Sequence, residues 1–210
     1  ADELLLGGGE IEIGLSLDGD RVSPRSVWTP VQKGQARVGK DDVVVVSGSG
    51  RGVTAACVIE WARASGAKFL LLGRSTLDEE PACCAGVSGD AELKRALLGA
   101  VKGEMPSPAV LGRQVRDLLA AREIRHTLAA IEAAGGQARY RSASVTDPQA
   151  IDAVLAEVRT DWGPVRALIH GAGVLADRKI ADQTDAQFDA VFGTKVEGLR
   201  VLLAALEADP

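Results

Sequence analysis

The sequence of 210 residues has little of what metal sites, disulfide frameworks and membrane spans require. It contains only three cysteines and two histidines, and none of them has the paired spacing of a zinc site. We therefore predict no metal, and we interpret the odd cysteine count as free thiols in a reducing compartment. No run approaches the roughly 18 apolar residues of a membrane helix, and the first residues are acidic, unlike a secretory signal. These absences predict a cytoplasmic protein without a membrane partner.

An excess of positive charge is also missing. The chain carries 24 basic and 29 acidic residues, a net charge of -5, and the two signs are interspersed rather than gathered in a basic stripe. We therefore expect no nucleic-acid partner. With 46% apolar and 25% charged residues, the chain is long enough to bury a proper core, most simply as one domain with a small appendage.

The first forty residues differ in pattern from the rest. Apolar residues alternate over Ile11–Leu15, a turn signal follows at Asp18–Asp20, and Arg25–Trp28 comes next. This pattern predicts a β-hairpin or a pair of edge strands. Residues 34–42 are polar and are typical of a linker. We therefore divide the chain into a β-structured appendage with its linker over 1–40 and a main domain over 41–210.

The main domain alternates apolar runs with helical patterns. Continuous apolar runs suit strands of a parallel sheet that are covered on both faces, and strand–helix repetition predicts a Rossmann-type, doubly wound α/β fold, here partial. A long helical insertion over about 76–121 interrupts the pattern, with helices expected near 91–101 and 107–121. The expected strands are 43–46, 68–72, 138–141 and 165–169, and the other expected helices are 53–65, 122–134 and 148–160.

A glycine-rich turn, Ser47–Gly52, joins the first of these strands to the first helix. Glycines let the backbone turn tightly beside phosphates, and the following helix N-terminus offers free N–H groups and a favourable dipole. A plain tight turn between strand and helix is the alternative interpretation, because such a motif alone is weak evidence.

Two more turns follow later strands and would lie at the same edge of the sheet. Arg74, between Gly73 and Ser75, stands where NAD-binding sites usually have an acid, and an arginine there accommodates the 2′-phosphate of NADP. The alternative, which we favour less, is an ordinary solvated surface arginine. His170 begins the small-residue turn that ends at Gly173, and for this histidine we favour a hydrogen-bonded framework role over that of a catalytic base.

Lys195 falls within an apolar stripe. The helix expected from Thr184, where a capping box with Gln187 fixes its start, places Lys195 among core-facing positions, where a lysine needs a partner or a purpose. A side chain whose ammonium reaches water past the helix is the alternative. The stripe comprises Phe188, Val191, Phe192, Leu199 and Leu202.

Taken together, the ordered motifs resemble the ketoreductase domains of polyketide synthases, within the short-chain dehydrogenase/reductase superfamily. The inserted segment, with Leu77–Pro81 and Ala121–Arg125, is most similar to the version in polyunsaturated-fatty-acid synthases. The resemblance covers about 41–206. Its motifs are Ser47–Thr54, Leu72–Ser75, Val145–Asp147, His170–Leu175 and Gly193–Gly198.

The resemblance implies NADPH-dependent reduction of a β-ketoacyl group to the β-hydroxyacyl thioester. The substrate would be tethered through phosphopantetheine to an acyl carrier protein, a partner together with other synthase domains. Lys195 matches the lysine that organises the family's active site. The implied cofactor-binding residues are Gly48, Ser49, Gly50, Arg51, Gly52, Val53, Gly73, Arg74, Ser75, Ser144, Val145, His170, Gly171, Ala172 and Gly173.

Two departures from the family pattern bear on activity. Ser144 stands where the family usually has an aspartate, which affects a contact to adenine. The sequence reaches Pro210 before the segment in which the resemblance places a serine and a tyrosine, and Tyr140 does not match that tyrosine. We therefore expect the chain alone to be an inactive, cofactor-binding part of a reductase. A non-catalytic structural domain of a synthase and a free-standing reductase of small ketones are the alternatives.

Overall fold

The computed structural model describes residues 12–30 and 37–210, which fall into two compact units, Ala1–Gln35 and Ala36–Pro210. In the first unit, strand β1 (Gly14–Leu15) pairs antiparallel with β2 (Arg21–Val22). Gly19 turns the chain between them with φ of 89°, a conformation that glycine adopts without strain. The hairpin interpretation is therefore confirmed. Part of the expected alternation, at Ile11, and part of the expected linker lie outside the described residues.

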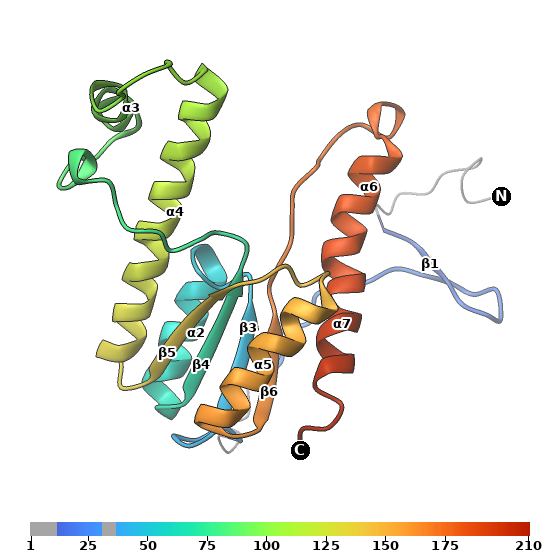
Figure 1. Ribbon diagram of the computed structural model, residues 1–210. Helices are drawn as coiled ribbons and strands as arrows, with labels where there is room; N and C mark the ends of the chain where they lie inside the picture. Colours follow the sequence, from blue (N-terminus) through green and yellow to red (C-terminus); the bar gives the residue numbers. More distant parts are fainter. Residues whose placement is uncertain (1–11, 31–36) are drawn as a thin grey trace. The chain divides into compact units, whose positions relative to one another are not determined.

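The second unit is built on a parallel four-stranded sheet in the order β5-β4-β3-β6 (Figure 1). The central strand β3 is wholly buried, and β4 is buried over its middle four residues, as continuous apolar runs predict. The α/β fold class inferred from the sequence is confirmed. The strands are β3 (Val43–Ser47), β4 (Lys68–Gly73), β5 (Gln137–Ser142) and β6 (Val165–His170).

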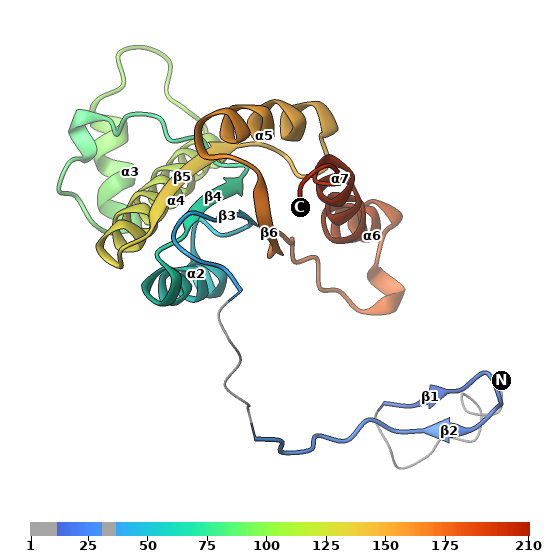
Figure 2. The ribbon, with the colours of Figure 1, turned by 90° about the horizontal axis from the view of Figure 1, so that it is seen from below.

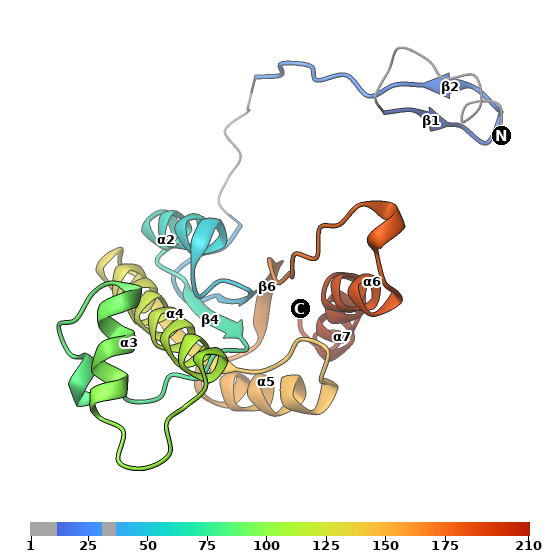
Figure 3. The ribbon, with the colours of Figure 1, turned by 90° about the horizontal axis from the view of Figure 1, so that it is seen from above.

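Helices cover both faces of this sheet (Figures 2 and 3). Helices α2 (Gly52–Ser65) and α4 (Pro108–Ala133) pack on one face through Val58 and Ile131. Helices α5 (Pro148–Trp162) and α7 (Gly198–Ala205) pack on the other through Leu155 and Leu202. At the start of α5, the Asp147 side chain accepts a hydrogen bond from the Ala150 N–H, 3.1 Å away. This capping residue and the proline after it explain why the helix begins there.

The insertion is joined to the main domain by one continuous helix. It contains the short 3-10 helix η1 (Ala82–Cys84), helix α3 (Asp90–Gly99) and the first half of α4, which share a small core. The predicted break between Ala121 and Arg122 is wrong, because α4 runs unbroken from Pro108 to Ala133. The stretch around the expected break has no glycine or proline and consists mainly of good helix formers.

Arg122, in the middle of α4, holds the loop of the insertion. Its guanidinium makes two hydrogen bonds to the Glu80 carboxylate, of 3.0 and 2.5 Å. It also donates to the carbonyls of Val87 and Cys84 at 2.6 and 2.7 Å. The paired guanidinium lowers the pKa of Glu80 below its ordinary value. The start of the insertion is therefore fixed to the same helix that packs on the sheet.

The last helical segment contains a π turn. Helix α6 (Asp185–Phe192) continues into the π-helix η3 (Gly193–Glu197) and then into α7, and the predicted capping box at Thr184 is confirmed. The predicted burial of the apolar stripe is wrong for most of its members: Phe188 is 56% exposed and Phe192 43%. Lys195 is also exposed. The wider π turn breaks the 3.6-residue period between α6 and α7. Phe188 and Phe192 precede this turn and stack on each other, with ring centroids 5.6 Å apart.

Within the described ranges, no helix is long and apolar enough to cross a bilayer. In the same ranges no three histidine, cysteine or acidic side chains gather as metal ligands would. Cys57, Cys83 and Cys84 carry free thiols.

Candidate functional site

A cavity of about 760 Å³ lies at the carboxyl edge of the sheet. The turns that follow β3, β4 and β6 line it, together with the loop after β5 and one face of α4. In sheets of this topology the ligand site lies where neighbouring connections leave in opposite directions, which here is between β3 and β6. The lining residues that the sequence predicted are Gly48, Gly50, Arg51, Gly73, Arg74, Ser75, Ser144, Val145, Gly171, Ala172 and Gly173.

The turn after β3 and the turn after β6 touch each other through backbone. Gly48 has φ of 68°, and a Cβ built on it would lie 2.5 Å from the backbone nitrogen of Ala172. The Gly48 N–H donates to the Leu72 carbonyl at 2.8 Å. Only glycine combines this conformation with so close an approach.

The N-terminus of α2 faces the glycine turn without a side-chain cap. Arg51 occupies the capping position, makes no capping hydrogen bond, and no acidic residue follows in the first turn. The N–H groups of this end are therefore open to an anion, and the helix dipole favours one. This arrangement is suited to a phosphate group.

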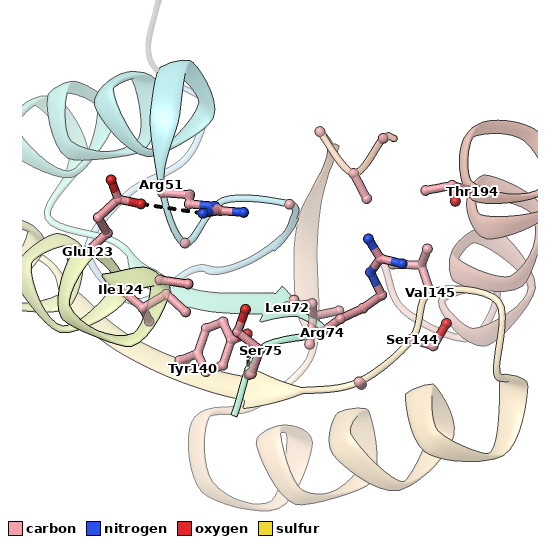
Figure 4. A pocket seen from close by; sticks show the side chains of 18 of the residues that line it. Arg51, Leu72, Arg74, Ser75, Glu123, Ile124, Tyr140, Ser144, Val145 and Thr194 are labelled. Carbon is pink, nitrogen blue, oxygen red and sulfur yellow. Dashed lines mark hydrogen bonds and ion pairs between the residues drawn. The ribbon is translucent and has the colours of Figure 1, made fainter. Parts of the chain in front are cut away.

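Three arginines line the cavity: Arg51, Arg74 and Arg116. The guanidinium of Arg51 lies 3.7 Å from the carboxylate of Glu123 on α4, and both side chains are more than half exposed. Figure 4 shows Arg51 with Glu123 on one side of the cavity and Thr194 on the other. The pair is open to solvent and is correspondingly weak, so an anionic ligand can take the place of the carboxylate.

Tyr140 lies beneath the turn after β4 and lines the cavity, a role that the sequence did not indicate. Its hydroxyl donates to the Ser75 carbonyl at 2.7 Å, and burial raises the pKa of this hydroxyl. A Cβ on Gly73 would lie 2.6 Å from the same oxygen, and a Cβ on Gly50 would lie 2.7 Å from Ile124 of α4. The signal in the sequence was the one tyrosine of the chain, in a strand whose other residues, apart from Ala138, are polar.

His170 connects the end of β3 to the π turn. Its Nδ1 lies 2.7 Å from the Ser47 hydroxyl, and its Nε2 lies 3.2 Å from the Thr194 carbonyl oxygen and 3.1 Å from that of Lys195. The Lys195 side chain lies against the turn after β6: a Cβ on Gly173 would be 2.9 Å from its Cε and 3.1 Å from its Nζ. In the described part of the chain no carboxylate pairs with this ammonium, which is therefore available beside the cavity.

Not every predicted site residue lines the cavity. Ser49 is buried and donates to the Val46 carbonyl at 2.9 Å, and Val53 is 81% exposed. Gly52, His170 and Lys195 adjoin the site without lining it. Helix α4 contributes residues that the sequence did not indicate, because their contacts cross the chain at long range: Arg116, Asp117, Leu119, Ala120, Glu123 and Ile124.

These features fit a dinucleotide. The cavity volume is in the range of small-molecule sites, the uncapped helix end suits a pyrophosphate, and the glycine turns leave room where a Cβ would collide with neighbouring atoms. Three guanidinium groups against two carboxylates, those of Asp117 and Glu123, leave the cavity wall with an excess of positive charge, which is complementary to phosphate.

Residues 43–210 match the profile of the KR domain. The chain belongs to the KR family. The chain is 40% identical over 207 residues to a polyunsaturated fatty acid synthase polypeptide of Thraustochytrium sp., an alignment that covers 93% of the chain and 7% of that polypeptide. It is 39% identical over 100 residues to the reducing polyketide synthase PKS1 of Cochliobolus heterostrophus, covering 48% of the chain and 4% of that synthase. The KR domain thus spans a small fraction of the curated relatives it matches.

Solved structures share the fold. A ketoreductase domain from the bacillaene assembly line aligns with a TM-score of 0.61 at 22% identity, covering 86% of this chain and 33% of the other. A metagenomic short-chain oxidoreductase in complex with NADP aligns with a TM-score of 0.54 at 19% identity, covering 80% of this chain and 56% of the other. The chain therefore shares the Rossmann-like fold of these short-chain reductases, one of which was solved with NADP bound.

Proposed function

We propose that this KR domain binds NADPH and forms the cofactor-binding part of a β-ketoacyl reductase in a multienzyme synthase. The observation that carries the proposal is the cavity between the turns after β3, β4 and β6, with Arg51 and Arg74 at its wall. An acid after β4 would favour NAD, whereas a guanidinium complements the 2′-phosphate that distinguishes NADP.

Each part of the cavity has a role in this proposal. The uncapped N-terminus of α2 and the Gly48 turn hold the pyrophosphate. Arg74 binds the 2′-phosphate, and Ser144 and Val145 border the adenine. The turn from Gly171 to Gly173 borders the ribose and nicotinamide, as the ends of sheet strands do in this fold.

Among the described residues, Lys195 is the one that we assign to the reduction step itself. When bound, the cofactor's part is to supply hydride to the carbonyl carbon of the substrate. The resulting alkoxide must be protonated, and an ammonium beside the Gly173 turn stabilises developing negative charge and eases that proton transfer. The substrate in this proposal is a β-ketoacyl thioester on the phosphopantetheine arm of an acyl carrier protein, and the similarity to fatty acid and polyketide synthases supports it. The free thiols fit a cytoplasmic location.

Calorimetric titration of the full chain with NADPH and NADH tests the cofactor. Arg74→Gln is expected to weaken NADPH binding about 10- to 100-fold, because a hydrogen bond between charged groups contributes about 1.5–3 kcal/mol. NADH, which lacks the 2′-phosphate, should bind nearly as before.

Arg95→Gln is the matched control, because it removes the same charge from α3, where Arg95 pairs with Glu92 away from the cavity. Equal losses for both variants, or equal losses for both cofactors, would contradict the assignment of Arg74. Failure of the unchanged chain to bind either cofactor would favour a non-catalytic structural domain.

A further inference from the structure

His170 joins the end of β3 to the π turn that carries Lys195, and both of its ring nitrogens are engaged. We propose that His170 is a positioning residue: it holds the π turn at a fixed place against the sheet and thereby keeps Lys195 over Gly173. This proposal rests on the proposed function only for the catalytic role of Lys195, and the position of Lys195 does not depend on it.

The hydrogen bonds determine which ring nitrogen carries the proton. The carbonyl oxygens of Thr194 and Lys195, 3.2 and 3.1 Å from Nε2, can only accept, so Nε2 must donate. In the neutral ring Nδ1 then accepts, and the Ser47 hydroxyl at 2.7 Å donates to it. The tautomer is therefore set by the neighbours of the ring.

Ser47 is itself held from the other side. Its side chain is fully buried at the end of β3, and its oxygen accepts from the Ala172 N–H at 3.3 Å. Its carbonyl accepts from the Gly171 N–H at 3.0 Å. A chain of hydrogen bonds thus runs from the turn after β6, through Ser47 and His170, to the backbone of the residue that bears the ammonium.

The π turn directs backbone carbonyl groups at the His170 ring. In the π turn the Gly198 N–H bonds to the Gly193 carbonyl, five residues earlier, and two successive carbonyls point at one nitrogen. Gly198 is buried, and a Cβ there would lie 2.7 Å from Val145 and 3.4 Å from the His170 ring. The close approach and the π turn, a feature frequent at functional sites, both set the distance between helix and sheet.

Two substitutions separate the two contacts of the ring. His170→Gln places an amide donor about where Nε2 lies and keeps the bonds to the π turn, whereas His170→Asn reaches only about as far as Nδ1 and keeps Ser47 alone. The glutamine variant thus loses the hydrogen bond to Ser47, and the asparagine variant loses the hydrogen bonds to the π turn. Similar thermal stabilities would show that any difference between them at Lys195 is not a general loss of folding.

Nuclear magnetic resonance on the full chain provides both readouts. Imidazole nitrogen spectra should show the His170 proton on Nε2, and His126→Asn assigns the signals because the chain has two histidines. The nuclear Overhauser contact between the Lys195 Cε protons and the Gly173 Cα protons should be present in the unchanged chain, retained in His170→Gln and lost in His170→Asn.

A proton on Nδ1 would overturn the proposal, and so would a Lys195–Gly173 contact that survives in His170→Asn. The tautomer is measured on the unchanged chain, so the test stands even where a variant does not fold. Neither readout depends on NADPH. If the chain binds no NADPH while both signatures are present, the proposed function fails and the positioning role of His170 stands.

Discussion

Gly48→Ala should destabilise the fold through two separate effects. At φ of 68°, any residue with a Cβ is strained by about 1–2 kcal/mol. The new Cβ would also lie 2.5–2.7 Å from backbone atoms of Gly171 and Ala172, and forcing the two turns apart costs about 1–3 kcal/mol more, as overpacking usually does. The free energy of unfolding, measured by urea denaturation of the full chain, should fall by about 2–5 kcal/mol from these two contributions.

Gly52→Ala isolates the first effect. Its φ is 70°, and a Cβ there would have no atom within 4 Å, so only the conformational cost of about 1–2 kcal/mol applies. The difference between the variants measures how tightly the turns after β3 and β6 are pressed together. Equal destabilisation by the two substitutions would refute the conclusion that these turns meet at a rigid backbone contact.

Two further predictions concern hydrogen bonds at opposite ends of the sheet. Tyr140→Phe leaves the Ser75 carbonyl without its 2.7 Å partner and should lower the free energy of unfolding by about 1 kcal/mol; an unchanged urea midpoint would contradict this. Arg159 lowers the pKa of the Asp209 carboxyl, which also accepts a hydrogen bond from the Val165 N–H. Between the lowered and the ordinary pKa, this carboxyl is therefore charged in the folded state and protonated in the unfolded chain. The difference in free energy of unfolding between the unchanged chain and Asp209→Asn should be largest at pH values above 3.8, the ordinary pKa of an aspartate. It should vanish as the pH falls through the lowered pKa of the folded state. A difference that does not depend on pH would count against the ion pair.

The sheet could be predicted from the sequence because its information is local. Val43–Val46 and Phe69–Leu72 are continuous apolar runs, and both are buried on two faces. The glycine turn and Arg74 follow these strands directly, so locating the strands also located the turns at one edge. The glycine turn and Arg74 line the cavity because they follow neighbouring strands that end at the same edge.

The rest of the site depends on contacts that no local pattern records. Glu123 reaches Arg51 from α4, and Tyr140 reaches Ser75 from the neighbouring strand. The Lys195 stripe was predicted from a regular helical period, and the period fails where the π turn widens the helix. Periodicity also shows which residues share a face without showing whether anything covers that face, which is why Phe188 was placed in a core and is exposed.

The continuity of α4 links the insertion to the wall of the cavity. At 1.5 Å per residue the 26-residue helix is about 39 Å long; one part packs on the sheet, and the other carries the core of the insertion (Figure 1). A shorter connection in place of 76–121 would remove Arg116, Asp117, Leu119 and Ala120 from the cavity wall. The insertion and this wall of the cavity therefore belong to one rigid element, and a change in the length of the insertion also changes the cavity.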